Sequence, residues 1–416
     1  MRLFLSLLML LAVFTLSAQR ECAVMEYSQQ LLKHYPALAV EFSRVDAFIE
    51  QKNSGSSSRI GNIPAHTIIR IPVVVHILYA TAAQNISDEQ VKSQLAALNR
   101  DFRKKNGDTS NTPLYFKPLA ADVEIEFYLA TADPKGRATT GIVRKKTAIT
   151  EFGLNDKIKF TSQGGDDAWD TKSYLNVWVG PMIKLLGYAS APGSPVDKDG
   201  VVINVSAFGT VNTAAPYHLG RTTVHEVGHW LGLKHIWGDV NCGDDGIEDT
   251  PVQAGFTKDC PSGVRTTCGN APTGDMYMNY MDFTNDACLN LFTHGQRERM
   301  RRMFDDGGPR NSLLFSKGLD TPWLSEAVLP IEQDHVSVPV SVFPNPVTSE
   351  VKLSFGNDYT WIGKELSIIN MNGIVVQKQI ITSGMQRISM NHLPAGFYII
   401  KADNGTKELK ERLVKL

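Results

Sequence analysis

The order of apolar and polar residues predicts alternating strands and helices in the first part of the chain. Residues 66–80, "HTIIRIPVVVHILYA", are rich in β-branched side chains and predict a long strand. Shorter runs of the same kind predict strands at residues 123–130, 174–179 and 201–205, and we expect a short basic helix near residues 294–304. Strands interleaved with helices, followed by a loop-rich half, indicate an α+β domain.

One segment carries a clear amphipathic pattern. Residues 87–106 begin at Ser87, and Gln90 follows at the spacing of an N-terminal capping box. Apolar positions recur every three or four residues, which predicts a helix with one face against the core. That face is made by Val91, Leu95, Leu98 and Phe102.

The pattern changes again toward the C-terminus. Turn-forming residues at 306–309 and 321–322 mark the end of the α+β domain. From about residue 336 apolar and polar residues alternate, and Asn372-Gly373 and Asn404-Gly405 are hairpin signals. We therefore expect a main domain at 59–317, a linker at 318–335 and a small all-β sandwich at 336–416.

The N-terminal segment has the features of a secretory signal. A basic start, an apolar run from Leu3 to Leu16 and small residues after it predict a signal peptide at residues 1–19. The run is short for a membrane-spanning helix, so a retained anchor is the weaker alternative and no integral membrane segment is expected in the mature form. The stretch "QKNSGSSSR" at 51–59 is typical of a flexible linker, and residues 20–58 are interpreted as a removable pro-segment.

Charge and cysteine content narrow the possible partners. The chain has 42 basic and 43 acidic residues, which gives no electrostatic reason to expect nucleic acid or an anionic membrane as partner. Export permits disulfides, and four clustered cysteines fit two bridges in any of three pairings: Cys242, Cys260, Cys268 and Cys288. Cys22 stands apart from them and needs a separate explanation.

Residues 225–235, "HEVGHWLGLKH", carry the candidate chemistry. Residues four apart project side by side on an α-helix, so His225 and His229 can share one metal ion. Gly232 permits the left-handed turn that ends a helix, and His235 can then return as a third ligand. Three imidazoles and an open position are the arrangement of catalytic zinc, whereas a helix with incidental histidines does not explain the complete pattern.

Glu226 adds the reactive group beside these histidines. Zinc lowers the pKa of a bound water toward about 7, and a positioned carboxylate can take its proton as the hydroxide attacks a carbonyl. Glu226 can then pass that proton to the leaving amine. The motif therefore predicts a zinc endopeptidase that hydrolyses proteins or peptides.

The same pattern is the signature of the metzincin metallopeptidases, which this chain resembles. Members of that group carry a methionine turn below the metal, and "MNYMDFTNDAC" offers Met281 as the candidate. Alone, Met281 would be ordinary core packing, but its place after a complete zinc motif favours the turn. The resemblance implies a metzincin-like catalytic domain with a twisted sheet, an active-site helix and a loop-rich lower half.

Within the metzincins, "LGRTTVHEVGHWLGLKHIWGD" and the four downstream cysteines resemble the pappalysin family. The resemblance covers roughly residues 68–304 and implies the bridges Cys242–Cys268 and Cys260–Cys288.

The resemblance also implies roles for residues near the methionine turn. Asp286 matches the acid at the base of the family's specificity pocket, where it would select arginine, and less well lysine, just after the cleaved bond. A solvated loop acid is the alternative for Asp286. The family's tyrosine two residues after the turn methionine is Phe283 here, so turnover is expected to be slower, and nothing in the sequence shows that the nearby Tyr280 replaces it.

The loop "CGDDGIEDTP" at 242–251 concentrates acidic residues. By itself it is not an EF-hand, and a solvated acidic loop is the plain alternative. The family resemblance implies a structural calcium ion here, with Asp245 and Thr250 on matching positions and the Glu248 carbonyl assisting.

The unpaired cysteine suggests a mechanism of latency. The thiolate of Cys22 can occupy the fourth zinc position, as in zymogens of the family, although an intermolecular disulfide is the alternative. Cleavage between Ser58 and Arg59 would release the mature enzyme, and an arginine-selective site could make this cut itself.

The C-terminal stretches "SVFPNPVTSEVKLSF", "IINMNGIVV" and "LPAGFYIIKADNG" resemble the sorting domain of type IX secretion cargo. This implies the outer-membrane secretion machinery as partner and a secreted or cell-surface location, reached via the periplasm of a Gram-negative bacterium. An adhesion or carbohydrate-binding sandwich is the alternative for this domain. For the whole chain the competing functions are a metallopeptidase of other specificity and a surface binding protein with a metal-bearing scaffold, and the intact Glu226 argues against the second.

Overall fold

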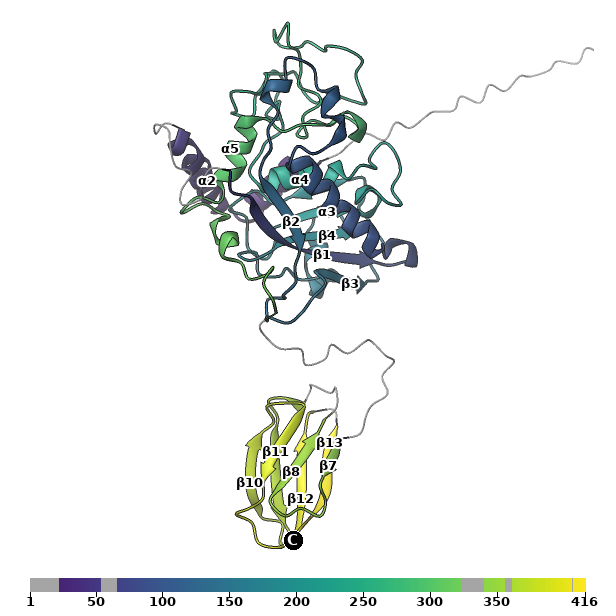
Figure 1. Ribbon diagram of the computed structural model, residues 1–416, viewed down its shortest axis with the longest axis vertical. Coiled ribbons are helices and arrows are strands. Elements are labelled where there is room, and N and C mark those ends of the chain that lie inside the picture. The colour runs from purple at the N-terminus through teal and green to yellow at the C-terminus, as the bar shows by residue number, and fades with distance from the viewer. Residues whose placement is uncertain (1–21, 54–65, 323–339, 356–360, 406) are drawn as a thin grey trace, which may run out of the picture. The chain divides into compact units, whose positions relative to one another are not determined.

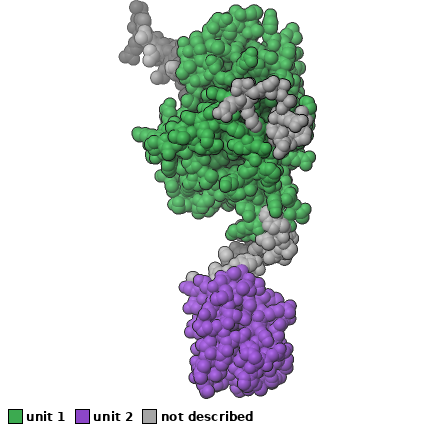
Figure 2. All heavy atoms as spheres, turned by 90° about the vertical axis from the view of Figure 1, so that its left-hand side faces the viewer, with its two compact units in different colours: residues 1–325 green, residues 326–416 purple. Residues whose placement is uncertain are grey.

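The computed structural model describes residues 22–53, 66–322, 340–355, 361–405 and 407–416. The chain divides into two compact units, Met1–Ser325 and Glu326–Leu416, which are shown in separate colours in Figure 2. The predicted signal peptide, the predicted cleavage site at Ser58 and Arg59, and most of the predicted linker lie outside the described residues. Among the helices that are described, none is long and apolar enough to cross a membrane.

A six-stranded sheet forms the centre of the first unit (Figure 1). Its pairs are parallel except at one edge, where a strand of three residues pairs antiparallel with its neighbour. The order is β2-β1-β4-β6-β5, and β3 pairs with the second half of β1. The strands are β1 (Ile69–Tyr79), β2 (Ile125–Leu129), β3 (Ile142–Lys146), β4 (Leu175–Gly180), β5 (Gly187–Ala189) and β6 (Val201–Asn204).

β1 is buried on both faces, which explains its continuous run of β-branched residues. Ile71, Val73, Val75 and Ile77 join the main core, whereas Leu78 joins a smaller core on the other face. The strands predicted at 123–130, 174–179 and 201–205 are β2, β4 and β6 with slightly different ends.

Two helices, α3 (Asp88–Phe102) and α4 (Arg221–Trp230), contact each other and pack into the main core beside the sheet (Figure 1). The Ser87 hydroxyl caps α3 by accepting a hydrogen bond from the Gln90 amide N–H at 3.2 Å. The Gln90 side chain, however, donates to the Phe208 carbonyl at 2.9 Å. Only half of the predicted capping box therefore forms, because a tertiary contact takes the glutamine.

The region of the predicted pro-segment is packed into this same unit. It forms α1 (Val24–His34) and α2 (Leu38–Asn53). Tyr27 of α1 is buried in the smaller core and Ile49 of α2 in the main core. Arg302, at the end of α5 (His294–Arg302), donates to the Ile49 carbonyl at 3.1 Å.

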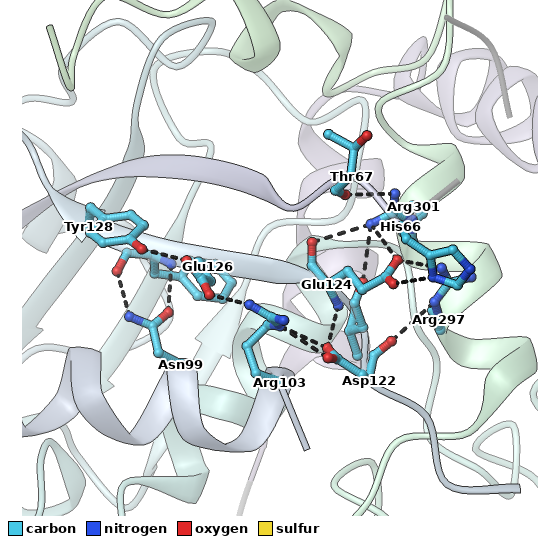
Figure 3. A network of polar contacts seen from close by, with 12 residues as sticks. His66, Thr67, Asn99, Arg103, Asp122, Glu124, Glu126, Tyr128, Arg297 and Arg301 are labelled. Atoms are coloured by element: carbon cyan, nitrogen blue, oxygen red, sulfur yellow. Dashed lines mark hydrogen bonds and ion pairs between the residues drawn. The ribbon is translucent and has the colours of Figure 1, made fainter. Parts of the chain in front are cut away.

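α5 also fastens the start of β1 through a polar network (Figure 3). Glu124 forms an ion pair with Arg297 and lies 3.4 Å from a guanidinium nitrogen of Arg301. Arg301 donates to the Thr67 carbonyl at 3.0 Å, and His66 Nδ1 lies 2.8 Å from a Glu124 carboxylate oxygen. The first described residues after the predicted cleavage site are therefore held against α5.

The second unit is all-β, as predicted. It has two antiparallel sheets, of order β10-β9-β12-β13 and β11-β8-β7. The turn at Asn372-Gly373 joins β9 to β10, and the turn at Asn404-Gly405 joins β12 to β13. The strands are β7 (Ser341–Phe343), β8 (Glu350–Ser354), β9 (Glu365–Asn370), β10 (Val375–Ile380), β11 (Met385–Ser389), β12 (Gly396–Asp403) and β13 (Glu408–Lys415).

Candidate metal centre and active site

The three motif histidines converge where α4 ends. His225 and His229 project from α4 one turn apart, and Gly232, at φ +85°, turns the chain so that His235 returns toward them. Nε2 of His229 lies 3.0 Å from Nε2 of His225 and 3.1 Å from Nε2 of His235. All three side chains are buried.

Each ring is oriented by an oxygen on its other nitrogen. His225 Nδ1 lies 2.7 Å from the Tyr280 carbonyl, and His229 Nδ1 lies 2.9 Å from the Leu233 carbonyl. His235 Nδ1 lies 2.6 Å from a carboxylate oxygen of Asp239. Because these oxygens only accept, the three Nδ1 atoms carry protons and the three Nε2 atoms present lone pairs to one point. Such lone pairs repel unless a cation lies between them, so the site fits a zinc ion with one open position.

Burial reinforces this arrangement at the central ring. The pKa of His229 is lowered well below its usual value, chiefly by burial and also by His235. The neutral imidazole is the form that binds a metal ion.

Glu226 lies between the histidines and the edge strand β5. A side chain at Gly187 would place its Cβ 2.9 Å from Cγ of Glu226, so only glycine lets the strand approach this closely. Cys22 forms a parallel bridge with Gly187, and its thiol lies 3.6 Å from Oε2 of Glu226. The Cys22 sulfur and the ligating nitrogens of the three histidines all lie within 4.8 Å of one another.

The thiol thus lies at the fourth corner of the metal centre. Burial, followed by the nearby Glu226 carboxylate, raises the pKa of Cys22 well above its usual value. A thiolate at this position therefore needs a cation beside it, which three neutral imidazoles would hold. In the sequence, roughly half of the chain separates Cys22 from His225, and the fold brings them together.

Met281 supports α4 from below. An ideal Cβ at Gly228 would lie 2.6 Å from the Met281 sulfur, so the methionine packs directly against the helix backbone between His225 and His229. The Met281 amide N–H donates to the Asn279 side-chain oxygen at 2.9 Å. The methionine turn therefore meets the helix in its last turn, between two of the three histidines.

A reciprocal pair of amides fastens this turn to α5. Asn279 donates to Gln296 at 2.8 Å, and Gln296 donates back to Asn279 at 3.1 Å. Both side chains are buried, which makes the pair costly to break.

Phe283, at the position where the family resemblance implies a tyrosine, lies within an aromatic wall. Its ring centroid lies 4.8 Å from that of His235, 5.0 Å from Trp237 and 5.4 Å from Phe256. Tyr280 does not replace the missing hydroxyl, because its ring packs against Phe292 and below the Arg221 guanidinium.

Asp286 is fully buried at the start of η7 (Asp286–Cys288), so it is not a solvated loop acid. Its Oδ2 accepts hydrogen bonds from the Leu219 amide at 2.8 Å and the Arg221 amide at 3.3 Å. These amides form the N-terminus of α4, where a negative charge is stabilised by the helix dipole. Asp286 therefore ties the chain after the methionine turn to the first turn of the active-site helix.

Sequence reasoning missed the charge cluster at this end of α4. Arg221 lies 3.3 Å from Asp101 and 2.6 Å from Asp108, and its side chain is 2% exposed. An arginine in the first turn of a helix opposes the dipole, so its presence there was a signal that acidic partners lie close by.

Two disulfides cross the loop-rich half. They join Cys242 to Cys268 and Cys260 to Cys288, and Cys22 is a free cysteine. The second bridge holds the residue two positions after Asp286.

The acidic loop is organised around Asp245. Its Oδ1 accepts from the Thr250 hydroxyl at 2.6 Å, while its Oδ2 is buried without a hydrogen-bond partner among the described residues. Burial raises the pKa of Asp245 to about 6. The Glu248 side chain is exposed, and Asp249 instead accepts from the Gly295 amide at 2.8 Å at the start of α5.

Comparison with known proteins agrees with this chemistry. Residues 160–305 match the Peptidase_M43 family, described as pregnancy-associated plasma protein-A. Residues 341–416 match the secretion system C-terminal sorting domain. An extracellular metalloprotease of Pyricularia oryzae is 31% identical over 68% of this chain and 88% of its own length, and one of Arthroderma gypseum is 31% identical over 61% and 78%.

Solved structures give a closer likeness. Mature mirolysin of Tannerella forsythia in complex with a cleaved peptide is 49% identical, with a TM-score of 0.59 over 60% of this chain and 96% of that one. A mutant of promirolysin from the same organism is 44% identical, with a TM-score of 0.65 over 71% of this chain and 97% of that one.

Proposed function

We propose that this chain, which belongs to the pappalysin family of zinc metallopeptidases, cleaves peptide bonds before arginine, and less well lysine, and is made as a self-processing zymogen. It is a secreted metallopeptidase of that family. The observation that carries the proposal is the convergence of three Nε2 atoms beside Glu226, at a corner that a pro-segment thiol reaches.

The residues around this corner divide the chemistry among them. A zinc ion held by three imidazoles supplies a Lewis acid that polarises a carbonyl and acidifies water. The carboxylate of Glu226 lies beside the open corner, where it can accept a proton from an attacking water and return it to the leaving amine. A substrate strand can pair with the edge of β5, as Cys22 pairs with Gly187.

Peptide hydrolysis by the processed enzyme tests this mechanism. Glu226→Gln keeps the size of the side chain and removes its basicity, so kcat should fall by ~10² or more while stoichiometric zinc remains. Chelation should abolish activity and added zinc should restore it. Unchanged turnover in Glu226→Gln would contradict the assigned role.

The proposed specificity rests on Asp286. It lies five residues after Met281, as the family resemblance implies, and its buried carboxyl group contacts the first turn of α4. A library of peptides digested by the enzyme should show arginine, then lysine, after the cut. A preference for aliphatic or acidic residues at that position would contradict the role of Asp286 and leave the zinc chemistry intact.

The proposed latency assigns residues 20–58 to a pro-segment and 59–317 to the catalytic domain. The likeness to a promirolysin and the position of Cys22 support it. Zymogen incubated with zinc should acquire Arg59 as a new N-terminus. Pure Glu226→Ala zymogen should stay intact, and its processing at the same rate would contradict self-cleavage.

We also propose a calcium ion at the Asp245 loop, supported by the buried Oδ2 that lacks a protein partner. A hard cation would satisfy that oxygen and remove the cost of its burial. Calcium should raise the melting temperature of the intact protein but not of Asp245→Asn. Equal shifts of the melting temperature in both proteins would show that calcium binds at another site.

The sorting domain at 341–416 implies transfer by the type IX machinery. We propose the outer-membrane part of that machinery as its partner, with a linker at 318–335 before it. A chain that ends at residue 335 should accumulate in the periplasm of the producing cell. Its normal release would favour the adhesion alternative.

A further inference from the structure

A second cluster of buried polar groups lies outside the metal centre and is built around Tyr27 of α1. The Tyr27 side chain is 1% exposed. Its hydroxyl lies 3.1 Å from Oδ2 of Asp156 and accepts a hydrogen bond from Nζ of Lys159 at 3.0 Å. The hydroxyl of a tyrosine in the predicted pro-segment is therefore hydrogen-bonded to a buried aspartate and a buried lysine of the catalytic unit.

The pocket around Tyr27 contacts both the ring and the hydroxyl of the tyrosine. Lys159 is 0% exposed, and its Nζ lies 4.6 Å from the centre of the Tyr27 ring and 4.9 Å from that of Tyr188. The two tyrosine rings are 4.7 Å apart, and the Tyr188 hydroxyl donates to Oδ1 of Asp156 at 3.3 Å. The pocket thus combines cation–π contacts with a carboxylate that accepts hydrogen bonds from the tyrosine hydroxyls.

The pocket adjoins the active site without belonging to it. Tyr188 follows Gly187, which is the residue that bridges to Cys22. Tyr27 and Tyr188 share the smaller core with Trp178 and Val202, whereas α4 packs into the main core. The pro-segment therefore contacts the catalytic unit at the metal with Cys22 and at a separate cluster with Tyr27.

The helix α1 presents a matching surface. Val24, Tyr27 and Leu31 are its buried residues, and they share one face at helical spacing. Met25 and Tyr35 are exposed on the same segment. An amphipathic helix with a tyrosine in the middle of its buried face is therefore the shape and chemistry that this surface accepts.

We propose that the pocket of Asp156, Lys159 and Tyr188 is a binding site for a tyrosine on an amphipathic helix, and that its occupant is α1. It is a second anchor of the pro-segment, independent of the metal. When the metal is removed, α1 stays docked and keeps the adjacent Cys22 covered, so the loss of the zinc–thiolate contact alone does not free the cleft. The consequence for latency rests on the proposed function, whereas the pocket itself does not.

The hydroxyl of Tyr27 is the part of the contact that discriminates. Without it, Lys159 loses one of its acceptors and Asp156 one of its donors, while both charges stay buried between aromatic rings. A buried polar group that loses its partner is costly, so we expect Tyr27→Phe to increase opening of α1 about tenfold.

Alkylation of Cys22 measures this opening directly. Cys22 is the free cysteine of the chain, since the other four form disulfides. Full-length protein carrying Glu226→Ala avoids self-digestion, and a small alkylating reagent under native conditions reports how often the segment opens. Tyr35→Phe is the matched control, because Tyr35 is on the same segment and 46% exposed.

The measurement is made with zinc bound and after chelation. Tyr27→Phe should label about tenfold faster than the parent in both states, and Tyr35→Phe should label at the parental rate. Equal rates for the two variants would overturn the pocket. If chelation leaves the labelling rate of the parent unchanged, the proposed zinc–thiolate contact is contradicted. The ratio of the labelling rates of the two variants still tests the proposed Tyr27 pocket.

Discussion

Gly228 offers a sharp test of how the methionine turn supports the active-site helix. An added Cβ would lie 2.6 Å from the Met281 sulfur and 3.4 Å from its terminal carbon. Elsewhere in a helix, Gly→Ala gains ~1 kcal/mol of stability. Overpacking of a buried site costs about 1–3 kcal/mol, so we expect Gly228→Ala to lower the free energy of unfolding by up to ~2 kcal/mol.

The clash predicts a specific compensation. Met281 is completely buried, so Met281→Ala alone should cost about 2–5 kcal/mol through the cavity that it leaves. In the double variant the new methyl group has no sulfur to meet and fills part of that cavity. The two changes together should therefore cost at least ~1 kcal/mol less than the sum of the single changes.

Urea unfolding of full-length Glu226→Ala protein measures all four members of this cycle without self-digestion. Zinc content should fall in Gly228→Ala, because a shifted helix misplaces His225 and His229, and should recover in part in the double variant. Gly107→Ala is the control, since its added Cβ meets nothing within 4 Å. Additivity of the two changes within ~0.5 kcal/mol would refute the direct contact between the helix and the methionine.

Three further changes test single contacts. Phe283→Tyr restores a hydroxyl beside the metal ligands and should raise kcat by up to ~10²-fold, whereas an unchanged kcat would mean that the aromatic wall turns the hydroxyl away. Gly187→Ala puts a Cβ 2.9 Å from Glu226 Cγ and should lower kcat/KM about tenfold or more with zinc retained; normal kinetics would contradict the close approach of β5. Burial raises the pKa of Asp282 from 3.8 to about 6, so its contribution to stability is full below pH ~4 and is lost as the pH rises through 6. Asp282→Asn should therefore be more stable than the parent by up to ~3 kcal/mol at pH 8 and no more stable at pH 4, and parallel pH profiles of unfolding would contradict this.

Much of the fold could be predicted because the signals are local. β1 is buried on both faces, so its sequence is apolar without interruption, and α3 buries one face, so its apolar residues recur at helical spacing. β3 was missed because its residues are half-exposed and mostly polar, and β5 because three residues carry no period. The capping box was predicted in full but forms only in part for a different reason, since the Gln90 side chain bonds to a carbonyl that is distant in the sequence.

The metal ligands were equally local, whereas the groups that support them are not. His225, His229 and His235 fall on one helix and its following turn, so spacing alone predicts their meeting. Nothing in the sequence connects Tyr27 with Asp156 and Lys159, because each is ordinary in its own segment and only the fold brings them together. Sequence reasoning also could not show that the Asp286 carboxylate meets the amides at the start of α4.

The support around α4 bears on how the proposed pro-segment would keep the enzyme latent. The helix is held at its start by Asp286, at Gly228 by Met281 and at its last residue by Asp199, which accepts from the Trp230 indole at 3.1 Å. A helix held at three points has little freedom to move when the pro-segment leaves, so the metal geometry should be the same before and after activation. We therefore propose that latency depends on occupation of the fourth corner and not on distortion of the site. Because the Cys22 sulfur can leave the metal reversibly, the proposed second contact at Tyr27 would help to keep the sulfur at the fourth corner.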